Sequence, residues 1–158
     1  MKKSEIRKKI IKIRRANHSN KLKISFKSLF KIIKKEKIKG KIIGGYYPYN
    51  YEIDLIDILK KFEKKNYIIS LPKIKKNYQM NFLRWSTDDP LVINSLGIPE
   101  PISKDVKYPD IVLVPLVAFD KNLNRVGYGG GFYDRYIKKI KKINNAVSIG
   151  LAYSFQKV

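Results

Sequence analysis

The chain has no cysteine and a single histidine, His18, among its 158 residues. Disulfide bonds and thiolate metal sites are therefore excluded, and one imidazole cannot build a histidine-rich metal centre. Any metal ion must be held by oxygen ligands. No apolar stretch approaches the roughly 20 residues of a membrane-spanning helix, and the N-terminus alternates Lys and Ile rather than showing a signal peptide's apolar block. We therefore expect a cytoplasmic protein without a membrane partner.

Acidic residues are scarce, with 13 Asp and Glu against 35 Lys and Arg, and the formal net charge is +22 at pH 7. Such an excess of cations ordinarily indicates a nucleic-acid-binding protein, in which scattered tyrosines can stack on bases. Most of the cations are Lys, however, and abundant Ile, Asn and Tyr accompany them. The codons of these four amino acids are rich in A and T, so genome composition alone is sufficient to produce the bias; the alternative is that the surface charge has a function. No obligate nucleic-acid partner is expected.

Hydrophobic periodicity divides the chain into alternating helices and strands. Helices are predicted over residues 2–15, about 20–37, 53–65 and 132 to about 142, and strands over residues 41–47, 67–71, 110–115 and 146–152. Residues 72–80 and 99–109, rich in Pro and Lys, are predicted to be loops. The alternation favours a single α/β domain, a three-layer sandwich in which helices flank a mainly parallel sheet. Its active site is expected beyond the carboxyl ends of the strands.

A glycine-rich segment follows the third predicted strand: residues 125–135, Arg-Val-Gly-Tyr-Gly-Gly-Gly-Phe-Tyr-Asp-Arg, here called the glycine segment. Its four glycines let backbone N–H groups turn towards a ligand without interference from Cβ atoms. A helix beginning at Phe132 would add its N-terminal dipole, so the segment suits a phosphate group. It lacks the Gly-Lys-Ser/Thr of one nucleotide-binding motif and the last glycine of another. The alternative is a tight strand-to-helix turn that binds nothing.

Together with the preceding Val114-Pro-Leu-Val-Ala-Phe-Asp120, the glycine segment resembles the signature of the 5-formyltetrahydrofolate cyclo-ligase (methenyltetrahydrofolate synthetase) family. That signature runs from Pro-x-x-Ala-Phe-Asp into Arg-Leu-Gly-x-Gly-x-Gly-Tyr-Tyr-Asp-Arg, and Val126 and Phe132 are conservative replacements within it. The likeness extends from Lys3 to Gln156. It implies an open, NagB-like α/β fold and an ATP- and Mg²⁺-dependent ligase of folate metabolism. The reaction would convert 5-formyltetrahydrofolate to 5,10-methenyltetrahydrofolate, with release of ADP and phosphate, through a phosphorylated formyl group.

The resemblance also implies an ATP site. Lys3 and Arg7 match basic residues that contact ATP in the family; spaced i, i+4 on one helix, they can present two positive groups to one anion. A solvated helix face is the alternative for this pair. The segment that matches the family's ATP-binding loop comprises Arg125, Val126, Gly127, Tyr128, Gly129, Gly130, Gly131, Phe132 and Tyr133. Of these, Arg125 and Tyr133 are the candidate catalytic residues.

A folate site is implied in the same way. Glu52 matches the residue that contacts folate, and a carboxylate suits a reduced pterin because it accepts hydrogen bonds from adjacent N–H donors. The alternative is an acid in the first turn of a helix, where it complements the dipole. Trp85 can stack on the ligand or serve as a core anchor. The remaining expected folate contacts are Tyr47, Tyr128, Gly129, Gly130, Gly131 and Phe132. A positive surface would attract ATP and the polyglutamate tail of a cellular folate.

Asp134 matches a Mg²⁺ ligand of the family, in keeping with the preference of Mg²⁺ for one or two carboxylates plus phosphate oxygens and water. Its alternatives are helix capping and pairing with a nearby cation. Asp120 and Arg135 are expected to be scaffold residues. The family continues past Gln156 into a segment with a His-Asp pair, whose Asp belongs to the metal site, whereas this sequence ends at Val158. We therefore expect one domain, residues 1–158, without that segment, acting as a monomer; an inactive folate- or ATP-binding relative is the alternative.

Overall fold

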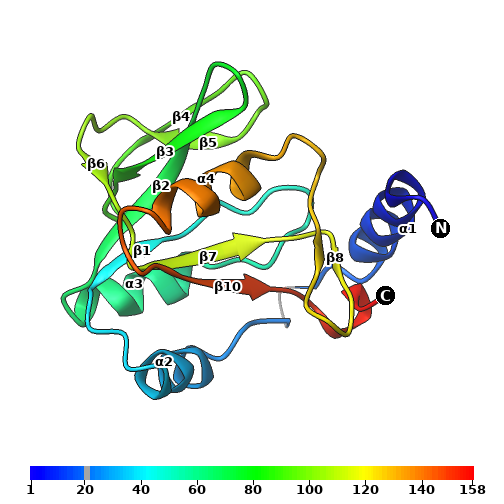
Figure 1. The fold of residues 1–158 in the computed structure, drawn as a ribbon, viewed down its shortest axis with the longest axis horizontal. Coiled ribbons are helices and arrows are strands. Elements are labelled where there is room, and N and C mark those ends of the chain that lie inside the picture. The colour runs from blue at the N-terminus through cyan, green and yellow to red at the C-terminus, as the bar shows by residue number, and fades with distance from the viewer. Residues whose placement is uncertain (20–21) are drawn as a thin grey trace.

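A six-stranded sheet forms the centre of the computed structural model, which describes residues 1–19 and 22–158 (Figure 1). The strands lie in the order β10 (Val147–Leu151), β7 (Ile111–Pro115), β1 (Ile42–Gly44), β2 (Ile68–Lys75), β3 (Gln79–Arg84) and β6 (Val106–Lys107). The first four are mutually parallel, and β3 and β6 are antiparallel to their neighbours. The expected α/β fold with a mainly parallel sheet is confirmed.

Helices cover both faces of this sheet. The helices are α1 (Lys3–Ala16), α2 (Phe26–Lys35), α3 (Ile56–Lys64) and α4 (Phe132–Ile140), with a 3-10 turn at Ser154–Gln156. On one face α2 and α3 pack with Ile111 and Leu113 of β7, and on the other α4 packs with Val112 and Val114. Because side chains alternate across a strand, a strand covered on both faces must be apolar throughout. All five residues of β7 are buried, and the three-layer prediction is confirmed.

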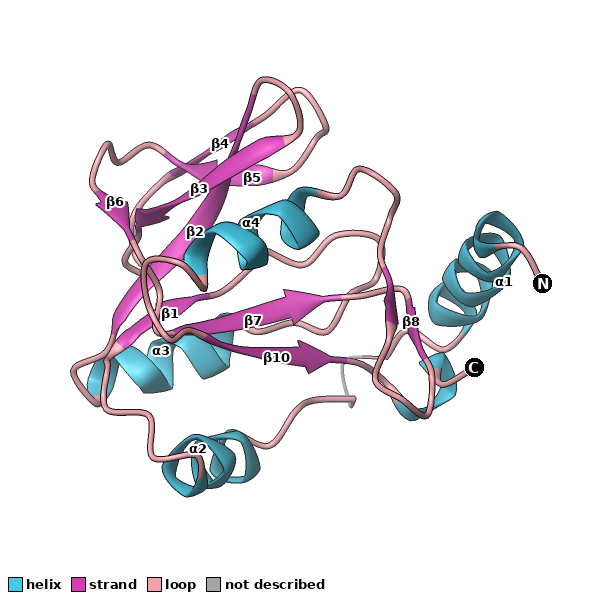
Figure 2. Cartoon of the chain, viewed as in Figure 1, coloured by secondary structure: helices cyan, strands magenta, loops and turns pink. Residues whose placement is uncertain are grey.

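α1 lies apart from these layers, beyond the arrowheads of β7 and β10 (Figures 1 and 2). Its apolar stripe, with Ile10 at the centre, packs on Val117 and Ala118 where the chain leaves β7. There β8 (Ala118–Phe119) and β9 (Arg125–Val126) form a short antiparallel ribbon that carries the chain into the glycine segment. The N-terminal helix is thereby placed beside the loops at the carboxyl ends of the strands.

The two predicted loops are partly strand, and both predictions were wrong in this respect. Residues 72–80 contribute to a long β2–β3 hairpin, in which Lys73 pairs with Asn81 and Ile74 with Met80. Residues 99–109 contain β5 (Pro99–Pro101), which pairs with β4 (Leu91–Ile93), and β6 at the sheet edge. Proline and lysine are tolerated at such edges, so their presence does not exclude a strand.

Several helices and strands are shorter than their patterns predict. α2 begins at Phe26 because the Ser25 Oγ atom accepts a hydrogen bond from the Ser28 N–H at 3.2 Å and caps the helix. Its predicted start at residues 20–21 lies outside the described residues. α3 begins at Ile56, whose N–H donates to Asp54 Oδ1 at 2.9 Å, rather than at Ile53. A polar side chain that binds the backbone thus sets the start of each helix.

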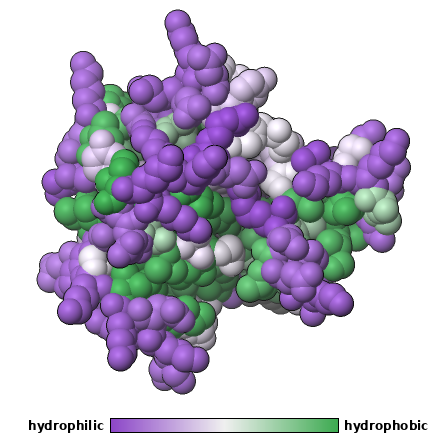
Figure 3. Space-filling model, in the orientation of Figure 1, coloured by the Kyte–Doolittle hydropathy of each residue, from purple (hydrophilic) through white to green (hydrophobic). Residues whose placement is uncertain are grey.

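Hydrophilic residues project around the periphery of the molecule in Figure 3, with apolar residues showing between them. In this view the hydrophilic residues are spread over the surface instead of gathering in one patch. No helix in the described part of the chain is both long enough and apolar enough to cross a membrane.

Candidate active site

A cavity of about 560 Å³ lies at the carboxyl ends of β1, β2 and β7, where the site was expected. This volume is in the range of small-molecule sites. The cavity is lined by Lys3 and Arg7 of α1, by Tyr46, Tyr47, Tyr49, Asn50 and Glu52 after β1, by Pro72, Ile74, Tyr78 and Met80 of the β2–β3 hairpin, by Asn94, Leu96, Ile98 and Pro99 of the β4–β5 hairpin, and by residues 125–134 of the glycine segment, with Pro115. Segments far apart in the sequence therefore converge on one site.

The glycine segment forms one wall of this cavity. Gly129 and Gly131 have φ angles of +112° and +71°, which side chains strongly disfavour. Gly131 is the N-cap of α4 and, having no side chain, cannot cap the first N–H groups of the helix. These N–H groups and the positive end of the helix dipole are therefore available to an anion. This geometry is suited to binding a phosphate group.

Basic side chains border the same wall. Lys3 and Arg7 both face the cavity from α1, and the Arg7 Nε atom donates a hydrogen bond to the Gly127 carbonyl oxygen at 2.7 Å. Arg125 pairs with Asp134 and lies 6.0 Å from the centre of the Tyr133 ring. The structure thus brings all three predicted basic residues to the glycine segment.

Asp134 is the candidate metal ligand, and its side chain is 76% exposed in the first turn of α4. Among the described residues no three His, Asp or Glu side chains gather into a metal-binding cluster. A single carboxylate beside a phosphate-binding loop still fits Mg²⁺, which takes most of its remaining ligands from phosphate oxygens and water. The pairing of Asp134 with Arg125 is the cation contact that the sequence left open, and it holds the carboxylate at the cavity rim.

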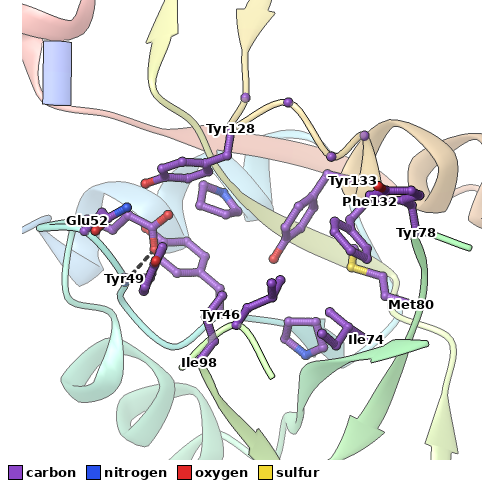
Figure 4. A pocket seen from close by; sticks show the side chains of 18 of the residues that line it. Tyr46, Tyr49, Glu52, Ile74, Tyr78, Met80, Ile98, Tyr128, Phe132 and Tyr133 are labelled. Atoms are coloured by element: carbon purple, nitrogen blue, oxygen red, sulfur yellow. Dashed lines mark hydrogen bonds between the residues drawn. The ribbon is translucent and has the colours of Figure 1, made fainter. Parts of the chain in front are cut away.

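Glu52 also lines the cavity and is 7% exposed. The Tyr49 N–H donates to its Oε2 atom at 2.8 Å, as Figure 4 shows. Burial raises the pKa of Glu52 to about 7, although the Tyr49 N–H, a hydrogen bond with Tyr128 and the charge of Arg14 act in the opposite direction. Because α3 begins only at Ile56, the alternative of an acid in the first helical turn is wrong.

Three tyrosines lie near Glu52: Tyr46 after β1, and Tyr128 and Tyr133 from the glycine segment (Figure 4). Burial, followed by the nearby Glu52 carboxylate, raises the pKa of each hydroxyl. The hydroxyls therefore stay protonated at neutral pH and can donate hydrogen bonds. Tyr46 was not predicted as a site residue, although its neighbour Tyr47 was, and both line the cavity.

Trp85 does not lie in the cavity, so stacking on a ligand is not supported. Its ring is 4% exposed within the main hydrophobic core, and its Nε1 atom donates to the Asp89 carbonyl oxygen at 3.1 Å. Apolar walls come instead from the two hairpins whose strands were missed. Tyr78, at the tip of the β2–β3 hairpin, lies 5.7 Å from the Phe132 ring and is 59% exposed.

Asp120 and Arg135 have structural contacts, as expected of scaffold residues. Asp120 Oδ1 accepts hydrogen bonds from the backbone N–H groups of Asn122 at 2.8 Å and Asn124 at 2.9 Å, which closes the β8–β9 turn. The Arg135 Nη1 atom donates to the Gly130 carbonyl oxygen at 2.7 Å and so braces the glycine segment from within α4.

Comparison with known proteins agrees with this geometry. The model of the 5-formyltetrahydrofolate cyclo-ligase family matches residues 1–158. The 5-formyltetrahydrofolate cyclo-ligase of Haemophilus influenzae is 38% identical over 131 residues, which span 78% of this chain and 69% of the relative. That of Mycoplasma genitalium is 33% identical over 135 residues, which span 85% of this chain and 71% of the relative.

Solved structures give the same result. The 5,10-methenyltetrahydrofolate synthetase of Aquifex aeolicus aligns with a TM-score of 0.79 at 31% identity, covering 99% of this chain and 80% of that one. The enzyme of the same name from Mycoplasma pneumoniae aligns with a TM-score of 0.72 at 26% identity, covering 100% and 89%. The fold is thus shared with two proteins named 5,10-methenyltetrahydrofolate synthetases.

Proposed function

Because the chain belongs to the 5-formyltetrahydrofolate cyclo-ligase family, we propose that it catalyses the ATP-dependent cyclisation of 5-formyltetrahydrofolate to 5,10-methenyltetrahydrofolate. ADP and phosphate are the other products. The observation that carries the proposal is one cavity lined both by a glycine-rich loop suited to phosphate and by a buried carboxylate, Glu52. ATP phosphates and a pterin ring require these two features, respectively.

The reaction needs ATP because an N-formyl group resembles an amide and its oxygen is a poor leaving group. Transfer of the γ-phosphoryl group of ATP to that oxygen releases ADP and forms an iminium phosphate. N10 of the folate then attacks the formyl carbon, the C–O bond breaks, and phosphate departs as the new ring closes. Such a reaction is accelerated mainly by positioning of the two substrates and by neutralisation of charge.

The glycine segment is suited to hold the phosphates of ATP. Residues around Gly129 and at the uncapped start of α4 line the cavity, and Lys3, Arg7 and Arg125 add positive charge. Arg125 is assigned to the transferred phosphoryl group, whose negative charge a guanidinium neutralises in a planar, bidentate contact. Tyr133 points its hydroxyl into the cavity and is assigned to orient the reacting formyl oxygen (Figure 4).

Glu52 is assigned to the pterin. Its carboxylate can accept hydrogen bonds from two adjacent N–H donors of the reduced ring, while Tyr46, Tyr47 and Tyr128 form the surrounding walls. Mg²⁺ would be held by Asp134 together with phosphate oxygens, and it would supply further charge neutralisation during phosphoryl transfer. The glycine segment is therefore assigned to ATP, and Glu52 with its neighbouring tyrosines is assigned to the folate.

The test follows the absorbance of 5,10-methenyltetrahydrofolate when the purified protein is mixed with 5-formyltetrahydrofolate and Mg²⁺, with and without ATP. We expect a rise that requires ATP and that disappears in a Gly129→Trp variant, whose indole would fill the phosphate end. Gly97→Trp is the matched control, because Gly97 lies in the β4–β5 turn with open space around it. No rise with the wild-type protein would refute the proposed function.

A further inference from the structure

Arg14 is the largest fully buried side chain of the described residues, with an exposed fraction of 1%. It lies in the last turn of α1, and its Nη1 atom donates to the Leu116 carbonyl oxygen at 3.3 Å. Its Nη2 atom donates to the Tyr128 hydroxyl. Among the described residues its Nε atom has no hydrogen-bond partner. A guanidinium withdrawn from water in this way is costly unless an opposite charge compensates it.

The compensating charge is Glu52, on the other side of the Tyr128 hydroxyl. The Tyr128 hydroxyl points toward the Glu52 carboxylate (Figure 4), and the Arg14 guanidinium carbon lies 5.7 Å from the Tyr128 ring centre. A guanidinium can only donate, so the Tyr128 oxygen must act as the acceptor in its contact with Arg14. Its single proton is then free to be donated to Glu52. Arg14 thus determines the direction in which the Tyr128 hydroxyl can donate.

The distribution of arginine supports a specific role. The chain is rich in lysine, and only six of its 35 basic residues are arginines. Four of these six belong to the glycine segment or contact it: Arg7, Arg14, Arg125 and Arg135. Lysine carries a compact charge and cannot offer the planar set of donors with which Arg14 contacts a carbonyl and a hydroxyl at once. Arginine therefore occurs at this site where its shape is used.

We propose that Arg14 is a positioning residue of the reaction, which acts through the Tyr128 hydroxyl to hold the Glu52 carboxylate ionised and oriented for the pterin N–H groups. This inference rests on the proposed function of Glu52 as the pterin ligand. It also assigns two roles to α1. Lys3 and Arg7 line the cavity, and Arg14, seven residues beyond Arg7 on the same helix, contacts Tyr128 near Glu52.

The charges around Glu52 make Arg14 decisive. The groups that lower the pKa of Glu52 are the Tyr49 N–H, the Tyr128 hydroxyl and Arg14, and the hydroxyls of Tyr46 and Tyr133 also lie close enough to respond to its charge. The tyrosines remain neutral, so among the described residues Arg14 is the cation whose charge lowers the pKa of Glu52. Without it, a larger share of Glu52 would be protonated at neutral pH and unable to accept two hydrogen bonds.

The test compares Arg14→Gln with Arg15→Gln, which makes the same charge change at an exposed position on the same helix. The first measurement is the ¹³C NMR titration of the glutamate carboxyl groups in the free protein. The chain has five glutamates, and Glu52→Gln identifies the Glu52 signal. We expect a wild-type midpoint near pH 7 that rises by about one unit or more in Arg14→Gln and stays unchanged in Arg15→Gln.

The second measurement is the pH profile of the KM for 5-formyltetrahydrofolate. A one-unit rise in the midpoint reduces the ionised fraction at pH 7 about fivefold, so the folate KM should rise by about that factor and recover above pH 8.5. The KM for ATP should not change. Arg14→Lys, which retains the charge but not the planar set of donors, should restore only part of the folate affinity. Tyr128→Phe removes the hydroxyl to which Arg14 donates and should also raise the Glu52 midpoint. This variant tests the inference if Arg14→Gln does not fold.

Two results would overturn the inference: an unchanged Glu52 midpoint in Arg14→Gln and Tyr128→Phe, or an unchanged folate pH profile in Arg14→Gln. Either would mean that Arg14 only anchors α1. Failure of the proposed function is a different result, since a wild-type protein that forms no methenyltetrahydrofolate would still titrate at Glu52.

Discussion

Arg125 and Asp134 form an ion pair across nine residues of chain, linking the start of the glycine segment to the first turn of α4. The contact closes the loop that surrounds Gly129 and Gly131, so the two ends of the phosphate-binding wall are held together. It also places a carboxylate and a guanidinium side by side at the rim of the cavity. One residue can then neutralise phosphate while the other holds a cation.

Replacing Asp134 with Asn is expected to raise the Mg²⁺ concentration needed for half-maximal activity by about tenfold, the equivalent of 1.4 kcal/mol. The amide keeps the shape of the side chain but is a much weaker Mg²⁺ ligand. Unfolding free energy should change by less than about 1 kcal/mol, because an ion pair with an exposed partner contributes little. Mg²⁺ titration of the rate and urea unfolding check the two expectations.

Asp57→Asn is the control for this substitution, since Asp57 is exposed and pairs with exposed Lys23 at 3.6 Å, far from the glycine segment in the sequence. It should leave the Mg²⁺ requirement unchanged. An unchanged requirement in Asp134→Asn as well would remove Asp134 from the metal site.

Gly129→Ala is expected to raise the KM for ATP by about tenfold or more, again about 1.4 kcal/mol. A φ of +112° is unfavourable for alanine, so the loop must shift and its N–H groups would be displaced from the phosphates of ATP. The backbone strain should also reduce stability by about 1–3 kcal/mol. Steady-state kinetics with varied ATP, together with thermal unfolding, measure both effects.

Gly97→Ala separates strain from binding. Gly97 has a φ of +76° and an added Cβ would meet no atom within 4 Å, so a stability loss of the same kind is expected without a change in the KM for ATP. Equal effects of both substitutions on ATP would contradict a phosphate contact at Gly129.

The stability of the free protein should fall as pH rises through the titration of Glu52. Its pKa of about 7 in the folded state lies above the usual 4.5, so the protonated form favours folding. Ionisation of Glu52 is expected to lower the free energy of unfolding by up to about 3 kcal/mol between pH 4.5 and pH 7 or above. Glu52→Gln should abolish that part of the pH dependence and also prevent folate binding. Urea unfolding from pH 5 to pH 8 provides the measurement.

Glu36→Gln is the matched control, because Glu36 is exposed at the end of α2. It should follow the wild-type pH dependence. If Glu52→Gln follows it too, the Glu52 carboxylate is not held in the buried environment described here.

Trp85→Phe and Tyr78→Ala should have opposite consequences. The first removes a buried indole and leaves the Asp89 carbonyl without its donor, so we expect a loss of about 1–2 kcal/mol in stability and unchanged KM values. The second removes an exposed ring that lines the cavity, so folate or ATP affinity should fall with little loss of stability. A raised folate KM in Trp85→Phe would contradict a purely structural role and indicate that Trp85 contributes to folate binding.

Much of the fold could be predicted because its signals are local. A few neighbouring residues are enough to predict the apolar strand β7, the helices α1 and α4, and the glycine-rich turn before Phe132. The β2–β3 and β4–β5 hairpins could not be predicted, since their strands are specified by partners across the sheet edge rather than by apolar alternation. The cavity walls at Ile74, Tyr78 and Ile98 were missed for the same reason.

The sequence by itself determined the phosphate-binding wall, because glycine conformation and the start of a helix are properties of neighbouring residues. Only the tertiary structure decided the surroundings of Glu52 and the position of Trp85. The burial of Glu52, the bridge from Arg14 through Tyr128, and the removal of Trp85 into the core all depend on which segments pack together. Desolvation and charge pairing act between residues far apart in the chain, so no local pattern could reveal them.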